Sequence, residues 1–175
     1  MYLEEISKDK HLFALADYPV VAVYDDSFYL RNDYDVLSTG QRHYLIKFFD
    51  KLGFRQKTGK TLVKDNITVH LPKPQSNLAT SAFDKKYLSA DPFNLYCLTP
   101  TQFAEVLFYD HQRLGEIELL QRLKSLIDKC PFNIEWLRDI SYSCPIEPIT
   151  KLHFQTISEY QQQVVAKTFK MKKPL

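Results

Sequence analysis

Glycine is scarce in this chain: its 175 residues include four glycines, at positions 40, 53, 59 and 115. Loops that cradle phosphate groups need closely spaced glycines, because the backbone must turn its N–H groups toward the anion. No pair here has the spacing of a dinucleotide-binding fingerprint, and the sequence contains no Gly-x-Ser-x-Gly elbow. These absences argue against dinucleotide-binding folds and against hydrolases built around a nucleophile elbow.

One stretch resembles a phosphate-binding P-loop in composition only. Residues 53–61 read GFRQKTGKT, which ends in the Gly-Lys-Thr of a P-loop but has one residue too many between its glycines. A P-loop follows a strand and opens a helix, whereas this stretch follows a helical pattern and leads into strands. We therefore predict that it binds no nucleotide.

The rest of the composition is that of a globular chain rich in aromatic residues, with 12 Phe, 11 Tyr and one Trp. Its length suits a single domain over 1–175. No apolar run is long enough to cross a membrane, and the first 17 residues carry acids where a signal peptide would be cationic and then apolar. Cys97, Cys130 and Cys144 form no CxxC pair. We expect a cytoplasmic protein with no cofactor, no bound metal and no membrane association.

Hydrophobic periodicity predicts short strands early in the chain and helices late. Strands are expected at 18–24 with 28–30 as one hairpin, at 61–63 with 67–71 as a second hairpin, and at 93–98. Helices are expected at 2–16, 38–52, 100–111, 116–129, 132–141 and 153–169, before a frayed basic tail at 167–175. Residues 75–92 give no consistent pattern.

This order of elements predicts an α+β fold. We expect a small antiparallel or mixed sheet, built from two hairpins and one βα unit, packed with about five helices in a chain whose C-terminal half is helix-rich. A doubly wound parallel sheet is disfavoured because only residues 93–111 read as a βα unit. The helix of that unit has a clear start, with Thr99 as N-cap, Pro100 at the first helical position and Gln102 placed to reach back.

Charge is segregated along the sequence, although the formal net charge is only +2. Residues 1–41 hold eight acids and three bases, whereas residues 42–73 hold eight bases and two acids. Blocks of this kind create local fields that steer charged partners. We expect acids of the first 41 residues to lie within a Debye length of the basic block and to neutralise much of it.

The basic block supplies the clearest candidate binding residues. The candidates are His43, Lys47, Lys51, Arg55, Lys57 and Lys60. The first three recur at i, i+4 spacing on one side of the helix expected at 38–52, and the others lie in the loop after it. Such a stripe could follow a phosphate backbone. The competing interpretation is an ordinary solvated helix face, with the interleaved aromatic residues in the core.

Acidic and nucleophilic residues give weaker candidates for catalysis. Asp33 and Asp35 alternate on an extended segment before a helix cap, as in catalytic Asp-x-Asp pairs, but no Gly-Ser helix start precedes them. Asp25, with its neighbours at 26 and 27, is typical of a turn. Cys97 lies in an apolar run, and the dyad at 110–111 occupies neighbouring helix positions that face different ways, so both are interpreted as structural.

Three functional hypotheses remain open from the sequence. The first is a non-catalytic macromolecular interaction module with a protein partner. The second is a nucleic-acid-associated protein that uses the basic face of residues 42–73. The third is an enzyme with an acidic site that includes Asp33 and Asp35. A flat apolar patch would favour the first, a continuous positive ridge the second, and a deep acidic cleft the third.

Overall fold

The computed structural model describes residues 2–27, 35–71, 81–140, 147–169 and 175. It is an α+β fold whose described part contains a six-stranded mixed sheet. Along the sheet the order is β1 (Leu12–Ala14), β2 (Val20–Val23), β6 (Asn94–Leu98), β5 (Ile67–His70), β4 (Thr61–Lys64) and β3 (Arg55–Thr58). Strands β2, β6 and β5 run parallel to one another, and the remaining neighbours are antiparallel.

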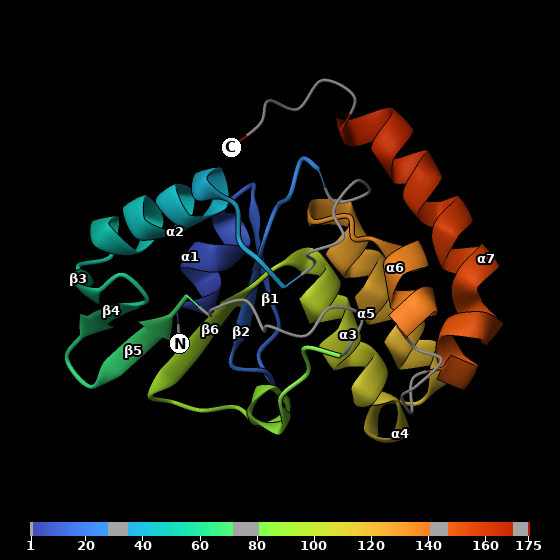
Figure 1. The fold of residues 1–175 in the computed structure, drawn as a ribbon, viewed down its shortest axis with the longest axis horizontal. Coiled ribbons are helices and arrows are strands. Elements are labelled where there is room, and N and C mark those ends of the chain that lie inside the picture. The colour runs from blue at the N-terminus through green and yellow to red at the C-terminus, as the bar shows by residue number, and fades with distance from the viewer. Residues whose placement is uncertain (1, 28–34, 72–80, 141–146, 170–174) are drawn as a thin grey trace.

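Helices cover both faces of this sheet (Figure 1). On one face lie α1 (Leu3–Lys8) and α2 (Thr39–Lys51), and on the other lie the helices that follow β6. The latter are α3 (Pro100–Tyr109), α4 (His111–Leu114), α5 (Glu116–Lys129), α6 (Ile134–Ile140) and α7 (Glu147–Val164), which leads into a π-helical turn at Val165–Phe169. A 3-10 turn at Lys85–Leu88 precedes β6.

The two faces enclose two separate apolar cores, and β2 contributes to both. Val20 and Ala22 point into the core formed with α3, α5, α6 and α7. Val21 and Val23 point into the core formed with α1 and α2. This division follows from the alternation of side chains along a strand, and a strand with both faces covered is a continuous apolar run.

The caps of α2 and α3 explain where these two helices begin. Ser38 and Gln41 form a capping box at α2, and Thr99 and Gln102 form the same arrangement at α3. The predicted cap at Thr99 is thus confirmed. Gly53 follows the C-cap of α2 with a φ of 87°, a left-handed conformation that favours glycine.

The sheet departs from the sequence-based prediction in two places. Residues 2–16 do not form one helix: α1 ends at Lys8, and 12–14 form strand β1, which pairs with β2. Leu12 and Phe13 are buried on opposite faces of the sheet, one in each core, so burial overrides the weak helical pattern. The predicted hairpin partner at 28–30 lies outside the described residues. The basic loop after α2 contains strand β3, whose four residues are all exposed and which pairs with β4.

Candidate functional site

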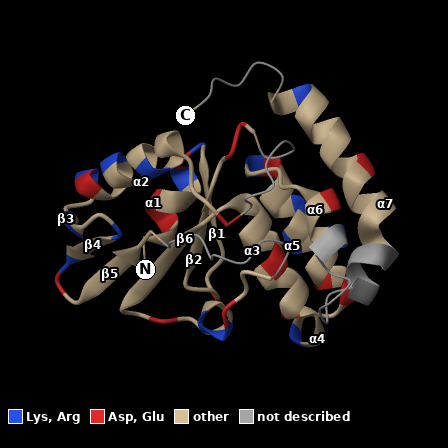
Figure 2. Ribbon diagram, in the orientation of Figure 1, with Lys and Arg blue, Asp and Glu red and all other residues tan. Residues whose placement is uncertain are grey.

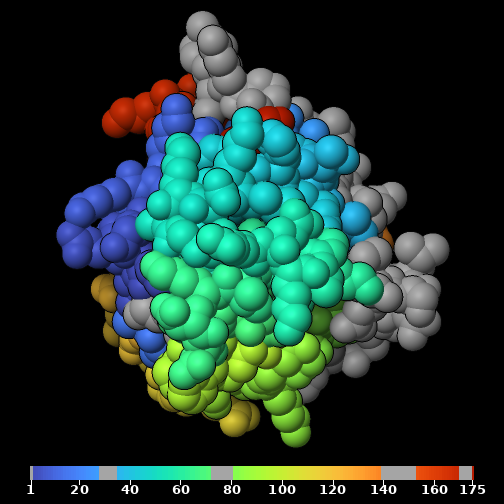
Figure 3. Space-filling view, turned by 90° about the vertical axis from the view of Figure 1, so that its left-hand side faces the viewer, coloured from blue at the N-terminus to red at the C-terminus, as the bar shows by residue number. Residues whose placement is uncertain are grey.

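The outer side of α2 carries a line of cationic side chains. Leu45 and Phe49 are completely buried against the sheet, so the opposite side of the helix faces solvent. His43, Lys47 and Lys51 are exposed there at four-residue spacing. Figure 2 shows basic and acidic residues along α2, and Figure 3 shows the face of the molecule that α2 forms together with the β3–β4 hairpin.

The β3–β4 hairpin next to α2 carries further cations, and the pairing of Arg55 with Val63 rather than with the buried Leu62 places Arg55 on the sheet face away from α2. Arg55 and Lys57 on β3 are exposed, as is Lys60 in the turn that follows. The guanidinium of Arg42, in the first turns of α2, donates a hydrogen bond to the carbonyl oxygen of Gly59 and so ties the helix to the hairpin. We call the six residues His43, Lys47, Lys51, Arg55, Lys57 and Lys60 the basic surface.

Among the described residues, none of the six side chains in the basic surface forms a salt bridge with a carboxylate. Lys64, a nearby cation, differs from them because its Nζ donates to the carbonyl oxygen of Leu52 at 2.6 Å and lies 5.3 Å from the centroid of the Tyr2 ring. Asp50 is exposed on the same side of α2 and is an acid within this line. The basic surface therefore consists of cations on α2 and on the neighbouring hairpin, with one acid, Asp50, on the helix.

We expected acids of the first 41 residues to neutralise the basic surface, and three of the described acids, Glu4, Asp9 and Asp17, form contacts with other groups. Glu4 pairs with Lys8 at 2.5 Å. Asp9 accepts hydrogen bonds from the backbone N–H of His11 and from the hydroxyl of Tyr44, both at 2.7 Å. Burial, followed by this hydrogen bond to Asp9, raises the pKa of the Tyr44 hydroxyl. None of these contacts involves the basic surface, and its neutralisation by acids within a Debye length stays a prediction.

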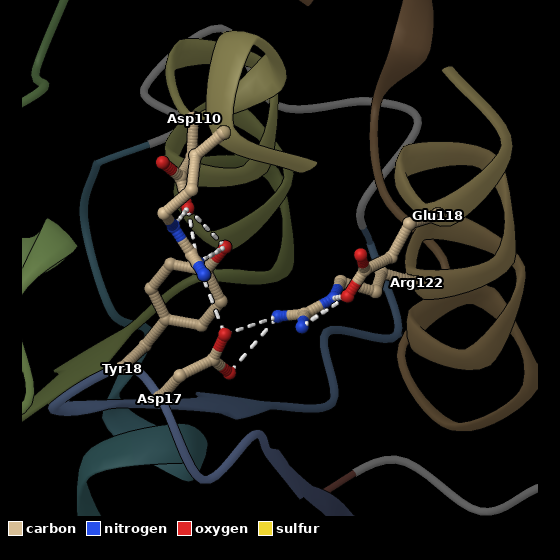
Figure 4. Close-up of polar contacts among 6 residues, drawn as sticks. Asp17, Tyr18, Asp110, Glu118 and Arg122 are labelled. Carbon is tan, nitrogen blue, oxygen red and sulfur yellow. Dashed lines mark hydrogen bonds and ion pairs between the residues drawn. The ribbon is translucent and has the colours of Figure 1, made fainter. Parts of the chain in front are cut away.

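Asp17, another acid of the first block, belongs to a polar network on the far side of the sheet (Figure 4). Its carboxylate lies 3.0 Å from Nη2 of Arg113 and 2.8 Å from Nη1 of Arg122. Partial burial raises the pKa of the Asp17 carboxyl, but the hydrogen bonds from Arg122 and Arg113 outweigh it and hold that pKa below its ordinary value. Arg122 also pairs with Glu118, its neighbour one helical turn away, at 2.5 Å.

The buried part of this network joins Tyr18 to Asp110. The Tyr18 hydroxyl donates to Oδ2 of Asp110 at 2.5 Å and accepts from Nη2 of Arg113 at 2.9 Å. Burial, followed by the hydrogen bond to Asp110, raises the pKa of Tyr18. Every carboxylate in the network is bound to an arginine, so the arrangement links the β1–β2 turn to α3, α4 and α5 rather than presenting a free acid or base.

The other candidate catalytic residues form contacts typical of residues that stabilise the fold. Asp110 binds Tyr18 and Arg113, while Nδ1 of His111 lies 2.9 Å from the carbonyl oxygen of Phe108. Cys97 is completely buried, and that burial raises the pKa of its thiol. Asp25 is buried and accepts a hydrogen bond from the backbone N–H of Ser27 at 3.0 Å, as in a turn.

The proposed acidic pair can be located only in part. Asp33 lies outside the described residues, and Asp35 is a half-buried residue in a turn before α2. Over the described ranges, no group of three or more His, Cys, Asp or Glu side chains could hold a metal ion. The structure therefore does not bring the candidate acids together into a described site.

None of these candidates lines the pocket beside α1, although Tyr18, which binds Asp110, does. This pocket has a volume of about 490 Å³ and lies under α1, where its walls are mostly apolar side chains from α1, the end of β1 and the starts of β5 and β6. Asp91 is its one ionisable carboxylate, and backbone and side-chain N–H groups of Phe93 and Asn94 bind that carboxylate. In the described chain, the two exposed large apolar side chains are Phe93, just before β6, and Ile117, in α5. They lie on different parts of the fold, so they form no apolar patch.

Sequence reasoning missed one polar cluster, formed by His70 on β5 and by Asp91 and Asn94 at the start of β6. Oδ1 of Asn94 lies 2.7 Å from Nε2 of His70, and the Asn94 amide donates to Asp91 at 2.9 Å. Only the parallel register of β5 with β6, which places Thr68 opposite Asn94, brings these residues together. The sequence offered no direct signal of that register.

Comparisons with protein-family models, with curated proteins and with solved structures found no match. Within the described ranges, no helix combines the length and the apolar character that crossing a membrane requires. We therefore infer the function from the geometry of the basic surface.

Proposed function

We propose that this chain is a non-catalytic binding module whose basic surface holds the phosphate backbone of a nucleic acid. One observation carries the proposal: six exposed cationic or titratable side chains lie on two neighbouring elements, and none has a carboxylate partner among the described residues. Three acids from the same half of the chain, Glu4, Asp9 and Asp17, are bound to other groups. The positive field of the basic surface is thus available to an external anion.

The geometry of α2 suits a repeating anion. His43, Lys47 and Lys51 follow one another at four residues, which is about 6 Å along a helix axis. The hydrogen bond from Arg42 to Gly59 fixes the hairpin that carries Arg55, Lys57 and Lys60 beside the helix. A line of cations held on two rigid elements can neutralise several successive phosphates and release their condensed counterions.

A protein partner is the second candidate, and strand β3 favours it. Among the described strands, β3 is at the edge of the sheet and pairs only with β4, and all four of its residues are exposed. An edge of this kind can receive an extended peptide as an additional strand. Arg55 and Lys57 would select an acidic segment. We propose this acidic peptide as the alternative occupant of the same region.

The test is a salt titration of nucleic-acid binding with charge-matched variants. Fluorescence anisotropy measures the affinity for a labelled oligonucleotide between low and physiological salt. The first variant removes Lys47, Lys51, Arg55 and Lys57 as alanines. The control variant removes the same total charge elsewhere, by alanine at Lys8, Lys85, Lys124 and Lys167.

The proposal predicts a steep decrease of log K with log salt concentration for the natural chain and for the control. The basic-surface variant should bind more weakly and have a slope smaller by about three to four, one counterion release for each lost contact. Equal slopes for the two variants would refute the proposal. Binding of a labelled polyglutamate peptide without binding of nucleic acid would instead support the second candidate.

A further inference from the structure

The pocket beside α1 has an apolar inner wall and small, exposed residues in its outer lining. The inner wall includes Ile6, which is completely buried, and Leu95 on β6, which is also buried. Ala16 and Ala90 belong to the lining but are exposed to solvent, so they mark the entrance. The volume of about 490 Å³ is within the range of small-ligand sites, roughly 300–1,000 Å³. The pocket can therefore admit a small organic molecule.

Asp91, next to Ala90 in the chain, carries the one formal charge among the described lining residues. Its Oδ1 accepts hydrogen bonds from the backbone N–H groups of Phe93 and Asn94, at 2.8 and 3.1 Å, and its Oδ2 accepts one from the Asn94 amide at 2.9 Å. These bonds, the one from Phe93 foremost, lower the pKa of Asp91, so the group is ionised at neutral pH. A carboxylate has about four acceptor positions, and these contacts use three. Oδ2 can thus accept a donor from a ligand.

The cations close to the pocket walls interact with other groups. Arg113 and Arg122 each lie 5.5 Å from the centroid of the Tyr18 ring, which lines the pocket, but both pair with Asp17. Lys64, beside the Tyr2 ring, donates to a backbone carbonyl oxygen. Among the described residues, none of the salt bridges includes Asp91. Its negative charge is therefore available to a cationic ligand.

We propose that this pocket binds a primary amine with an apolar tail. The tail packs against Ile6 and Leu95, and the ammonium group stays at the entrance, where it donates a hydrogen bond to Asp91 and keeps its other donors in water. Asp91 repels anions, and a strongly polar molecule would lose its hydration against the apolar walls. Because the phosphate backbone of a nucleic acid is an anion, this site is separate from the basic surface and does not depend on the proposed function.

The experiment compares four probes: hexylamine, hexanol, hexanoate and butylamine. Titrations followed by the NMR shifts of backbone amides give each affinity and locate the binding site. The natural chain should bind hexylamine about three- to tenfold more tightly than hexanol, the value of one net hydrogen bond, and hexanoate more weakly than either. Butylamine buries two methylene groups fewer and should bind about fifteenfold more weakly than hexylamine. The amides that shift should be those of residues 14–18 and 90–95.

Variants separate the charge from the cavity. Asp91→Asn keeps an oxygen acceptor for the backbone N–H groups and should lower the affinity for hexylamine to that for hexanol. Ala90→Phe blocks the entrance and should abolish binding of both, whereas the control Ala166→Phe, at an exposed alanine in the π-helical turn, should change neither. Equal affinities of the natural chain for hexylamine and hexanol would overturn the inference, even if Asp91→Asn failed to fold. Shifts confined to other parts of the chain, or binding that survives Ala90→Phe, would overturn it too.

Discussion

The effects of substituting Tyr18 and Asp110 on the free energy of unfolding should be strongly coupled, because the two side chains share a buried hydrogen bond. The two groups are 4% and 7% exposed, and the hydroxyl and carboxylate oxygens are 2.5 Å apart. A hydrogen bond to a charged group contributes about 1.5–3 kcal/mol. Tyr18→Phe removes the donor but leaves Asp110 bound to Arg113, so we expect a loss of about 2 kcal/mol in the free energy of unfolding.

A double-mutant cycle measures this coupling. Asp110→Ala removes the acceptor of the Tyr18 hydroxyl and leaves that buried hydroxyl with only its bond from Arg113, so we expect a loss of about 3 kcal/mol. Each single variant loses the Tyr18–Asp110 hydrogen bond, but the double variant loses it only once. The loss in the double variant should therefore be smaller than the sum of the single losses by a coupling energy of about 1–2 kcal/mol. Urea unfolding at neutral pH gives all four free energies.

An exposed pair of the same chemistry provides the control. The Tyr160 hydroxyl donates to Asp128 at 2.7 Å at the surface. Tyr160→Phe should change the stability by less than about 0.5 kcal/mol, since water replaces the lost bond. Additive losses for Tyr18 and Asp110, with coupling below about 0.3 kcal/mol, would show that burial does not strengthen this contact as argued.

Three further outcomes follow from described residues. Thr99→Ala removes the side-chain oxygen that caps α3 and should cost about 1 kcal/mol, so an unchanged urea midpoint would contradict the role of the cap. Gly40→Ala places a methyl group against the backbone carbonyl of Leu175 and should lower the thermal midpoint, whereas Gly59→Ala has open space around it and should not. Burial, then nearby negative charges, raises the pKa of Tyr87 to about 12. Its hydroxyl ionises near pH 10 only in the unfolded chain, so stability should fall as pH rises above 10, and Tyr87→Phe should make that fall shallower in urea titrations from pH 9 to 11.

Elements with strong local signals could be predicted from the sequence. In α2, buried Leu45 and Phe49 and exposed Lys47 follow the helical period, which can be seen in the sequence and which tertiary contacts reinforce. Thr99 and Gly53 mark helix ends through bonds and dihedral angles that need only neighbouring residues. The exposure of His43, Lys47 and Lys51 followed from the same period.

The remaining features depend on contacts that are distant in sequence. Strand β1 is short, and only its pairing with β2 and burial on both faces distinguish it from a helix. The contact of Asp17 with Arg122, 105 residues away, could not be predicted from the sequence. The contact of His70 with Asn94, 24 residues along the chain, likewise depends on the register of a parallel pair.

Strand β2 contributes side chains to both apolar cores, and this limits how its backbone can become exposed by local unfolding. Each of its four residues is fully buried, alternately in one core and the other. No motion confined to α1 and α2, or to the helices that follow β6, can free the backbone of β2, because the opposite layer still holds it. Amide hydrogens of β2 should therefore exchange with deuterium only through global unfolding, whereas those on the open side of β3 exchange through local fluctuations.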